Sequence, residues 1–145
     1  MSTTSRSISA TPERVWEVLS DGWLYPLFVV GASRMRDVDD DWPAVGSRLH
    51  HSVGTWPLLI DDTTEVLEAS ENERILLLAR GWPAGEAHVD ISLRPDGDST
   101  VVTIKEDATA GPGLLVPKVL RDPQLHLRNI ETLKRLAFVV EGRTT

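Results

Sequence analysis

The sequence predicts an α+β protein: an antiparallel sheet of about seven strands, two short helices after the first strand, and a long C-terminal helix. Two observations lead to this class. Short apolar runs are joined by loops too brief for parallel crossovers, which need a dozen residues or more. The last twenty residues carry an apolar stripe at helical spacing. A sheet with one apolar face must bury it, and the C-terminal helix is the available cover, so we expect the sheet to curve around that helix.

The N-terminal third begins with a short strand over residues 3–9 and continues with a helix over residues 11–21. Thr11 can cap this helix, Pro12 suits its first position, and Glu13 is favoured at the positive end of the helix dipole. The apolar stripe of the helix consists of Val15, Trp16, Val18 and Leu19. The following apolar segment, residues 22–30, is interrupted by Pro26 and predicts a short second helical turn.

Six further strands are expected around residues 33–38, 48–53, 59–67, 74–80, 86–93 and 100–108. The separator before the last strand contains Asp96-Gly97, a strong hairpin signal. In the closing helix, Asp122 and Pro123 are suited to the cap and first position, and Gly142 is suited to its end. Whether residues 111–119 join this helix stays open, because Pro117 and Pro123 both allow a kink.

Length and composition limit the classes of function. A chain of 145 residues is most simply one domain, residues 1–145, with a core of its own. The absence of cysteine excludes disulfides, thiolate metal sites and cysteine nucleophiles. A net charge of −7 argues against a nucleic-acid partner. No segment approaches the roughly 20 apolar residues of a membrane span, and residues 1–16 lack the apolar centre of a signal peptide. We therefore expect a soluble, cytoplasmic protein.

The order of elements resembles the helix-grip fold of the START-like superfamily, particularly its bacterial polyketide cyclase/dehydrase-like branch. The segments that carry the resemblance are SISATPERVWEVLSD (7–21), DDWPAVGSRL (40–49), TTEVLEASENERILLLAR (63–80), STVVTIKEDATAGPG (99–113) and RNIETLKRLAFVVEG (128–142). The resemblance implies a deep, mostly apolar cavity between the curved sheet and the long helix. Members use such cavities to carry lipids or small aromatics, to cyclise polyketides, or as partner-binding modules.

Strand alternation predicts which side chains face that cavity. The inner rows are expected to be Leu49, His51 and Val53; Ile60, Asp62, Thr64 and Val66; Ala87, Val89, Ile91 and Leu93; and Val102, Ile104, Glu106 and Ala108. His50, Ser52 and His88 should then face outward. The second row depends on whether Pro57 introduces a bulge. Met35 and Val38 lie on opposite faces of a regular strand, so the face of Arg36 stays open.

Several kinds of site are disfavoured. His50 and His51 are adjacent in a strand, so their side chains diverge and cannot easily hold one ion. The run Asp37, Asp39, Asp41 begins like a calcium loop, but tryptophan and arginine stand where glycine and the final glutamate are required. No nucleophile elbow or phosphate-binding loop occurs. We expect no metal and no cofactor.

His51, Glu106 and Asp62 are the ionisable groups expected in the cavity. An imidazole exchanges protons near neutrality, and burial tunes carboxyl groups toward the same range. Such groups could abstract a proton beside a carbonyl or dehydrate an aldol product. The alternative is that they bond to one another or to backbone groups near the cavity mouth. Among the aromatics, Trp56 and Trp82 suit the rim, and Trp42 suits the core.

The leading hypothesis is binding, and transport as an extension of it, of an apolar or aromatic small molecule that is polyketide-like or lipid-like. Its expected ligand-binding residues are Trp23, Tyr25, His51, Trp56, Asp62, Trp82, Val89, Ile91, Ile104, Glu106, Asn129 and Leu133. The main alternative is a cyclase or dehydratase in which His51 and Glu106 are the catalytic acid/base groups. A third is a non-catalytic partner-binding module, and a homodimer stays open.

Overall fold

The computed structural model describes residues 1–30, 32–53, 60–82 and 85–143. Its elements, in chain order, are β1 (Ser2–Ile8), α1 (Pro12–Leu19), the 3₁₀ turn η1 (Gly22–Leu24), α2 (Tyr25–Phe28), β2 (Ala32–Val38), β3 (Arg48–Val53), β4 (Ile60–Ser70), β5 (Arg74–Gly81), β6 (Gly85–Asp96), β7 (Ser99–Ala110), the 3₁₀ turn η2 (Pro112–Leu115) and α3 (Lys118–Glu141).

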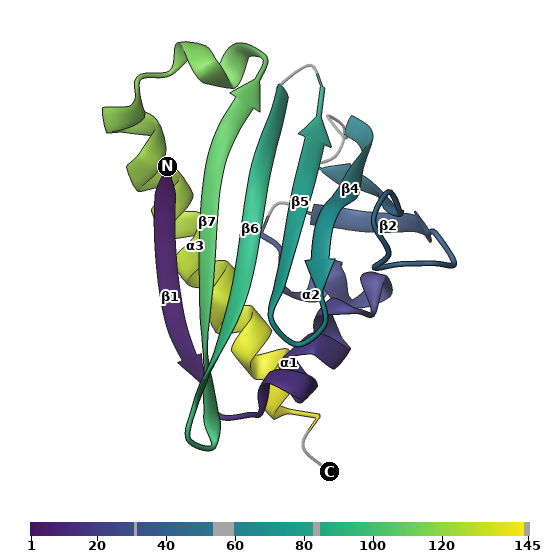
Figure 1. The fold of residues 1–145 in the computed structure, drawn as a ribbon. Coiled ribbons are helices and arrows are strands. Elements are labelled where there is room, and N and C mark those ends of the chain that lie inside the picture. Colours follow the sequence, from purple (N-terminus) through teal and green to yellow (C-terminus); the bar gives the residue numbers. More distant parts are fainter. Residues whose placement is uncertain (31, 54–59, 83–84, 144–145) are drawn as a thin grey trace.

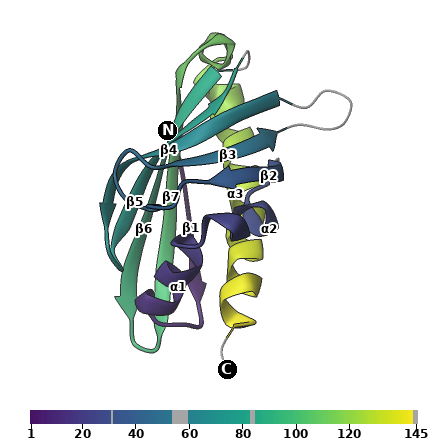
Figure 2. The same cartoon turned by 90° about the vertical axis from the view of Figure 1, so that its right-hand side faces the viewer.

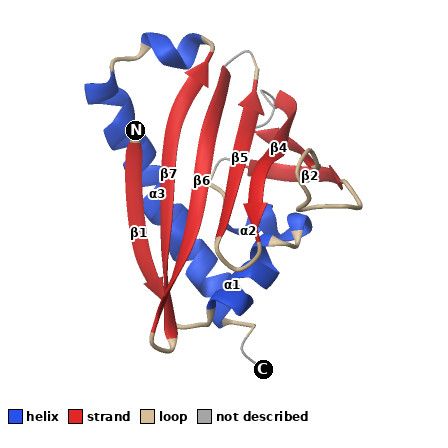
Figure 3. Ribbon diagram, in the orientation of Figure 1, coloured by secondary structure: helices blue, strands red, loops and turns tan. Residues whose placement is uncertain are grey.

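The strands form one curved antiparallel sheet in the order β1-β7-β6-β5-β4-β3-β2 (Figures 1 and 3). The long helix α3 lies on one side of this sheet, and α1 and α2 lie beside the C-terminal half of α3 (Figure 2). The predicted α+β class, with a long C-terminal helix covering an antiparallel sheet, is therefore confirmed.

The α1 region follows its sequence signals closely. The Thr11 side chain accepts a hydrogen bond from the Arg14 N–H (3.4 Å), and Pro12 is the first helical residue. The chain then turns through η1 and α2, which confirms the second helical segment. Glycine suits position 22 because a Cβ there would lie 2.5 Å from the buried Leu49 side chain on β3, which would have to shift.

The predicted start of the last helix is wrong. Helix α3 begins at Lys118, not at Pro123, and the N–H groups of Leu120 and Arg121 both donate to the Pro117 carbonyl (2.9 Å each). Pro117 ends the preceding segment, and Pro123 is accommodated inside the helix. The carbonyl that loses its helical partner belongs to Val119, a residue that is 78 % exposed, so water can satisfy it.

Strand β2 contains two irregularities that the sequence pattern did not reveal. Met35 pairs with His51 and Val38 pairs with Leu49, with a register shift between Met35 and Asp37. A bulge places two residues of one strand opposite one residue of its partner. Met35 and Val38 therefore both reach the core side, and Arg36 is the unpaired residue between them.

The core lies between the inner face of the sheet and the helices. Its largest fully buried side chains include Phe28, Ile8, Leu19, Leu49, Ile75, Ile104, Leu133 and Leu136. Trp42 is in this core, as predicted, and its indole N–H donates to the Leu19 carbonyl (3.1 Å). The Tyr25 hydroxyl donates to the same carbonyl (2.8 Å). Two aromatic side chains thus satisfy a carbonyl that the end of α1 leaves without a helical partner.

The predicted hairpin between the last two strands is confirmed. Asp96 pairs with Ser99, and Gly97 adopts a φ of +62°, which the turn requires. One outward-facing residue behaves differently from expectation: Ser52 is only 2 % exposed. It lies between the longer side chains of its pairing partners Arg34 and Asp61, and its hydroxyl donates to the Asp61 carboxylate (2.5 Å).

Candidate functional site

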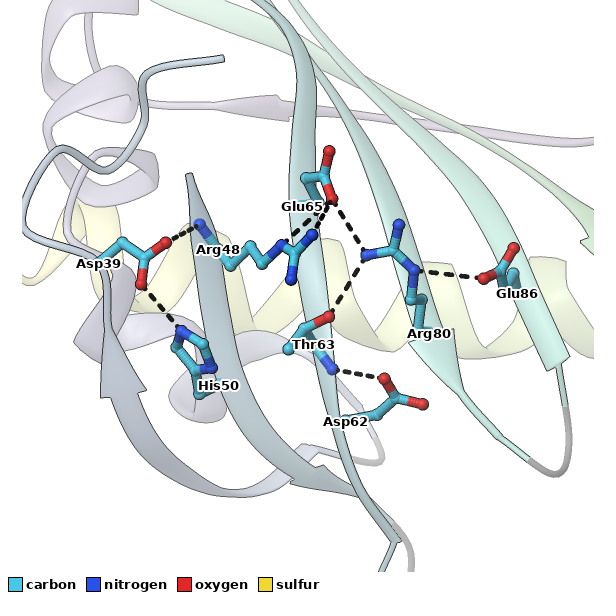
Figure 4. A network of polar contacts seen from close by, with 8 residues as sticks. All are labelled: Asp39, Arg48, His50, Asp62, Thr63, Glu65, Arg80 and Glu86. Atoms are coloured by element: carbon cyan, nitrogen blue, oxygen red, sulfur yellow. Dashed lines mark hydrogen bonds and ion pairs between the residues drawn. The ribbon is translucent and has the colours of Figure 1, made fainter. Parts of the chain in front are cut away.

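Strand β3 sends the two neighbouring histidines to opposite faces of the sheet, as predicted. His51 is 7 % exposed and pairs with Met35 on β2 and with Asp62 on β4. His50 is partly exposed on the other face, where its Nε2 lies 2.8 Å from an Asp39 carboxylate oxygen (Figure 4). The two imidazoles therefore belong to different environments.

His51 has one bonded nitrogen and one unbonded nitrogen. Its Nε2 lies 2.8 Å from the Thr64 hydroxyl, whereas Nδ1 is buried and has no hydrogen-bond partner among the residues that the structure describes. Burial lowers the pKa of His51, and the nearby Asp62 carboxylate offsets only part of this effect. The ring is therefore neutral at pH 7.

The charged neighbours of His51 are held by backbone groups. The Asp62 carboxylate accepts from the Thr63 N–H (2.9 Å; Figure 4) and from the Trp82 N–H (2.9 Å). The Arg36 guanidinium donates to the carbonyl oxygens of His51 (3.4 Å) and Asp62 (3.1 Å). Asp62 thereby links β4 to the end of β5, and Arg36 fills the bulge in β2.

A ladder of ion pairs crosses the outer face of the same strands (Figure 4). Arg48 on β3 contacts Glu65 on β4 (3.2 Å), and Arg80 on β5 contacts both Glu65 (3.3 Å) and Glu86 on β6 (3.2 Å). Alternating charges across neighbouring strands stabilise their pairing. The ladder thus stabilises the pairing of the strands whose opposite, inner face carries His51 and Thr64.

The inner face beside His51 carries unusually small side chains. Thr64 pairs with Ala79, and Ala87 pairs with both Ala79 and Ala108, so a row of alanines crosses β5, β6 and β7. We call Ala79, Ala87 and Ala108 the alanine strip. All three are half-buried, whereas the larger inner residues Ile75, Ile91 and Ile104, further along the same strands, are buried. The inner face is therefore only partly covered along the alanine strip.

Glu106 belongs to a second polar cluster at the other side of the sheet. It is 5 % exposed, and its carboxylate accepts hydrogen bonds from the Arg128 guanidinium and from the Asn129 amide (3.2 Å), both on α3. Three strands separate β7 from β3. Four strand spacings of about 4.8 Å place Glu106 on the order of 19 Å from His51 along the sheet, so the two groups do not contact each other.

The remaining predicted ligand residues that the structure describes fall into three groups. Ile91, Ile104, Leu133 and Tyr25 are buried in the core, and Val89 and Asp62 are half-buried on the inner face. Trp23 on η1 and Trp82 after β5 are 54 % and 45 % exposed, and the Trp82 indole N–H donates to Glu86 (3.2 Å). Trp56 and Pro57 lie outside the described residues.

Sequence reasoning missed Thr64 as the partner of His51 and Arg128 as the partner of Glu106. Alternation placed Thr64 on the inner face, but its contact with His51 depends on the β3–β4 register, which residue patterns did not determine. Arg128 was not among the predicted site residues. The available signal was Glu106 itself, since a carboxylate in an apolar row requires a cation or hydrogen-bond donors.

Two surface grooves occur elsewhere among the described residues. One, of about 340 Å³, is lined by Val45, Leu67, Glu68, Ala69, Ser70 and Arg74. The other, of about 440 Å³, is lined by Pro12, Glu13, Glu71, Asn72, Glu73, Leu93 and Pro95. Neither lining includes a predicted site residue. None of the described helices is both long and apolar enough to span a membrane.

Comparison with solved structures shows the same fold in other proteins. Protein CV1439 from Chromobacterium violaceum is 22 % identical over 96 % of both chains, with a TM-score of 0.70. TTHA0849 from Thermus thermophilus is 18 % identical over 99 % of both chains, with a TM-score of 0.73. DynU16, from a dynemicin biosynthetic locus, is 20 % identical over 97 % of this chain and 46 % of its own, with a TM-score of 0.64. At these identities the likeness establishes the fold alone.

No curated protein matches the chain. A family match, in contrast, covers nearly all of it: residues 2–136 match the family described as polyketide cyclase / dehydrase and lipid transport. The predicted resemblance is thus confirmed, and the chain belongs to the polyketide cyclase/dehydrase and lipid transport family.

Proposed function

We propose that this protein binds, and as a carrier transports, an apolar or aromatic small molecule between the inner face of the sheet and α3. The observation that carries the proposal is the alanine strip: three small apolar side chains, half-buried in a row, on the face that otherwise forms the core. A folded protein normally fills such a face with large side chains. Small side chains leave room for a flat apolar molecule to pack where large side chains would otherwise lie.

The surroundings of the alanine strip suit such a ligand. Leu77 and Val89 lie on the same face one step along β5 and β6, and they provide an apolar wall. Polar groups lie at both sides, with His51 and Thr64 toward β3 and the Glu106 cluster toward α3. Ligand sites combine an apolar lining with a few placed polar groups. The family description, which includes lipid transport, supports the same kind of ligand.

The test fills the alanine strip and leaves the rest of the sheet unchanged. Ala87→Phe adds a ring on the inner face, and the matched control His88→Phe adds the same ring one residue away on the exposed outer face. We expect 1-anilinonaphthalene-8-sulfonate to bind the wild type and the control alike. Binding to Ala87→Phe should be weaker by at least about tenfold, a loss of about 1.4 kcal/mol.

Thermal unfolding of each variant shows whether it is folded. Equal affinity of a folded Ala87→Phe and the wild type would overturn the proposed site.

The family description also favours a second candidate, a cyclase or dehydratase that uses His51 and Glu106 as acid/base groups. Because these residues lie on β3 and β7, with three strands between them, they would act at different ends of one substrate. Turnover of a linear polyketide substrate should then fall in both His51→Phe and Glu106→Gln. Unchanged turnover in both variants would remove this candidate.

A further inference from the structure

The buried ring of His51 bears on the chemistry of the proposed ligand. This side chain is more than nine-tenths buried, yet its Nδ1 has no hydrogen-bond partner among the described residues. Buried polar atoms are nearly always bonded, and one left unpaired is costly. The position therefore calls for a partner that comes from outside the described part of the chain.

The neighbouring charged groups do not fill this role. Both Asp62 carboxylate oxygens accept from backbone N–H groups, at 2.9 Å each, and the Arg36 guanidinium is bonded to two backbone carbonyls. Thr64 occupies the other ring nitrogen. The Thr63 backbone also interacts with the ring and raises its pKa, but it makes no hydrogen bond of regular geometry to Nδ1. Next to Thr64 across the sheet comes Ala79, the first residue of the alanine strip. His51 and the apolar alanine strip thus lie on one face of the sheet, with Thr64 between them.

We propose that the ligand carries a hydroxyl or carbonyl group that hydrogen-bonds to His51 Nδ1, while its apolar body lies along the alanine strip. This inference rests on the proposed function, because it assigns a polar anchor within the same site. If Thr64 donates to Nε2, then Nδ1 carries the proton and donates to a carbonyl. If instead Nε2 donates to Thr64, then Nδ1 accepts from a hydroxyl.

A neutral oxygen suits this position better than a carboxylate. Burial keeps the pKa of His51 low, so the ring offers a hydrogen bond without a positive charge. The Asp62 carboxylate beside it would repel a second carboxylate. The nearby Arg36 cation is already bonded to two backbone carbonyls and lies 3.7 Å from the Asp61 carboxylate. The ligand class is therefore a flat or elongated apolar molecule with a phenol, alcohol or ketone group at one end.

Four probes that share one apolar body separate these chemistries: naphthalene, 2-naphthol, 2-acetylnaphthalene and 2-naphthoate. We expect the wild type to bind 2-naphthol or 2-acetylnaphthalene about tenfold more tightly than naphthalene, the effect of one net hydrogen bond. It should bind 2-naphthoate no better than naphthalene. In His51→Leu the preference should fall below about twofold, whereas the outward-facing control His50→Leu should keep it.

Nitrogen-15 NMR of the wild type gives a second measurement that needs no variant. Addition of the preferred oxygenated probe should move the His51 Nδ1 resonance, and naphthalene should move it less. Equal affinity of the wild type for naphthalene, 2-naphthol and 2-acetylnaphthalene, or a preference that survives in His51→Leu, would overturn the anchor while leaving the apolar site intact. If none of the probes binds, or if they bind Ala87→Phe as well as the wild type, the proposed function itself fails.

Discussion

His51 is a buried histidine whose environment favours the uncharged ring. Its pKa in the folded protein lies below the value of about 6.5 that an unfolded histidine has. Above pH 6.5 both states are uncharged, and the residue adds no pH dependence. As the pH falls below 6.5 the unfolded state binds the proton first, so the free energy of unfolding decreases. The decrease continues until the pH passes the lower pKa of the folded state.

We therefore predict that wild-type stability falls between pH 7.5 and pH 5, and that His51→Gln shows a smaller fall. Urea unfolding at several pH values measures both slopes. The control His88→Gln, which removes an exposed imidazole, should keep the wild-type slope. If His51→Gln loses as much stability on acidification as the wild type does, His51 is not held in its neutral form.

Glu106 shows how a polar residue in an inner row of the sheet can be structural. Its carboxylate bonds to Arg128 and Asn129 and thereby joins β7 to α3. We predict that Glu106→Gln lowers the free energy of unfolding by about 1–3 kcal/mol, because it leaves the Arg128 charge without its partner. Since Arg128 is 39 % exposed, water relieves part of this cost.

The matched control is Glu131→Gln, which breaks an exposed ion pair with Arg135 on the same helix. It should change the stability by less than about 0.5 kcal/mol. Equal losses in the two variants, measured by urea unfolding, would show that the buried cluster does not hold α3 to the sheet.

At the residue scale, alternation was enough to separate His50 from His51 and to place Glu106 inside. Alternation describes one strand at a time, so it could not reveal contacts made across strands or with the helix. The hydrogen bond between His51 and Thr64 depends on the strand register, and the one between Glu106 and Arg128 depends on the position of the helix.

Helix α3 shows the limit of local signals at the scale of an element. Proline favours the first turn of a helix, and the local signal at Pro123 therefore predicted the helix start there. The structure uses Pro117 as the cap and keeps Pro123 inside, where its ring removes one backbone hydrogen bond. Exposure of this part of the helix makes the loss tolerable, and exposure is a property of the assembled fold.

We predict that Pro123→Ala stabilises the protein by about 1 kcal/mol, because the restored hydrogen bond outweighs the greater freedom of the unfolded chain. Pro117→Ala should bring no gain, since the cap position needs no helical N–H. Thermal unfolding compares the two variants. A Pro123→Ala variant that is less stable than the wild type would mean that the proline supports the geometry of α3.

Alternation could not predict which residues of β2 face inward, and the reason is related. Its bulge between Met35 and Asp37 breaks the period of two on which alternation depends. The helix α1 and the last hairpin, in contrast, carry their own start and turn signals, and both were predicted from the sequence.

For the whole molecule, the order of the helices and strands along the sequence was enough to predict the fold class. Short loops required antiparallel neighbours, and one long amphipathic helix was the only cover available, so the sheet and α3 followed from the sequence. The partly open inner face did not follow, because it depends on three alanines that become neighbours only when β5, β6 and β7 pair.

Helix α3, the last element, packs against β1, the first, as well as against α2. We therefore predict that the chain unfolds in one cooperative step. Tryptophan fluorescence, to which the buried Trp16 and Trp42 contribute, should change at the same urea concentration as far-UV circular dichroism. Two separated transitions would show that part of the fold is independent of the rest.

The most direct test of the central claim is to map a bound apolar probe by NMR. We predict that 1-anilinonaphthalene-8-sulfonate shifts the methyl resonances of Ala79, Ala87 and Ala108 more than those of the exposed residues Leu115, Val119 and Leu127 on η2 and α3. Shifts confined to those exposed residues, with the alanine methyls unchanged, would contradict a ligand site on the inner face of the sheet.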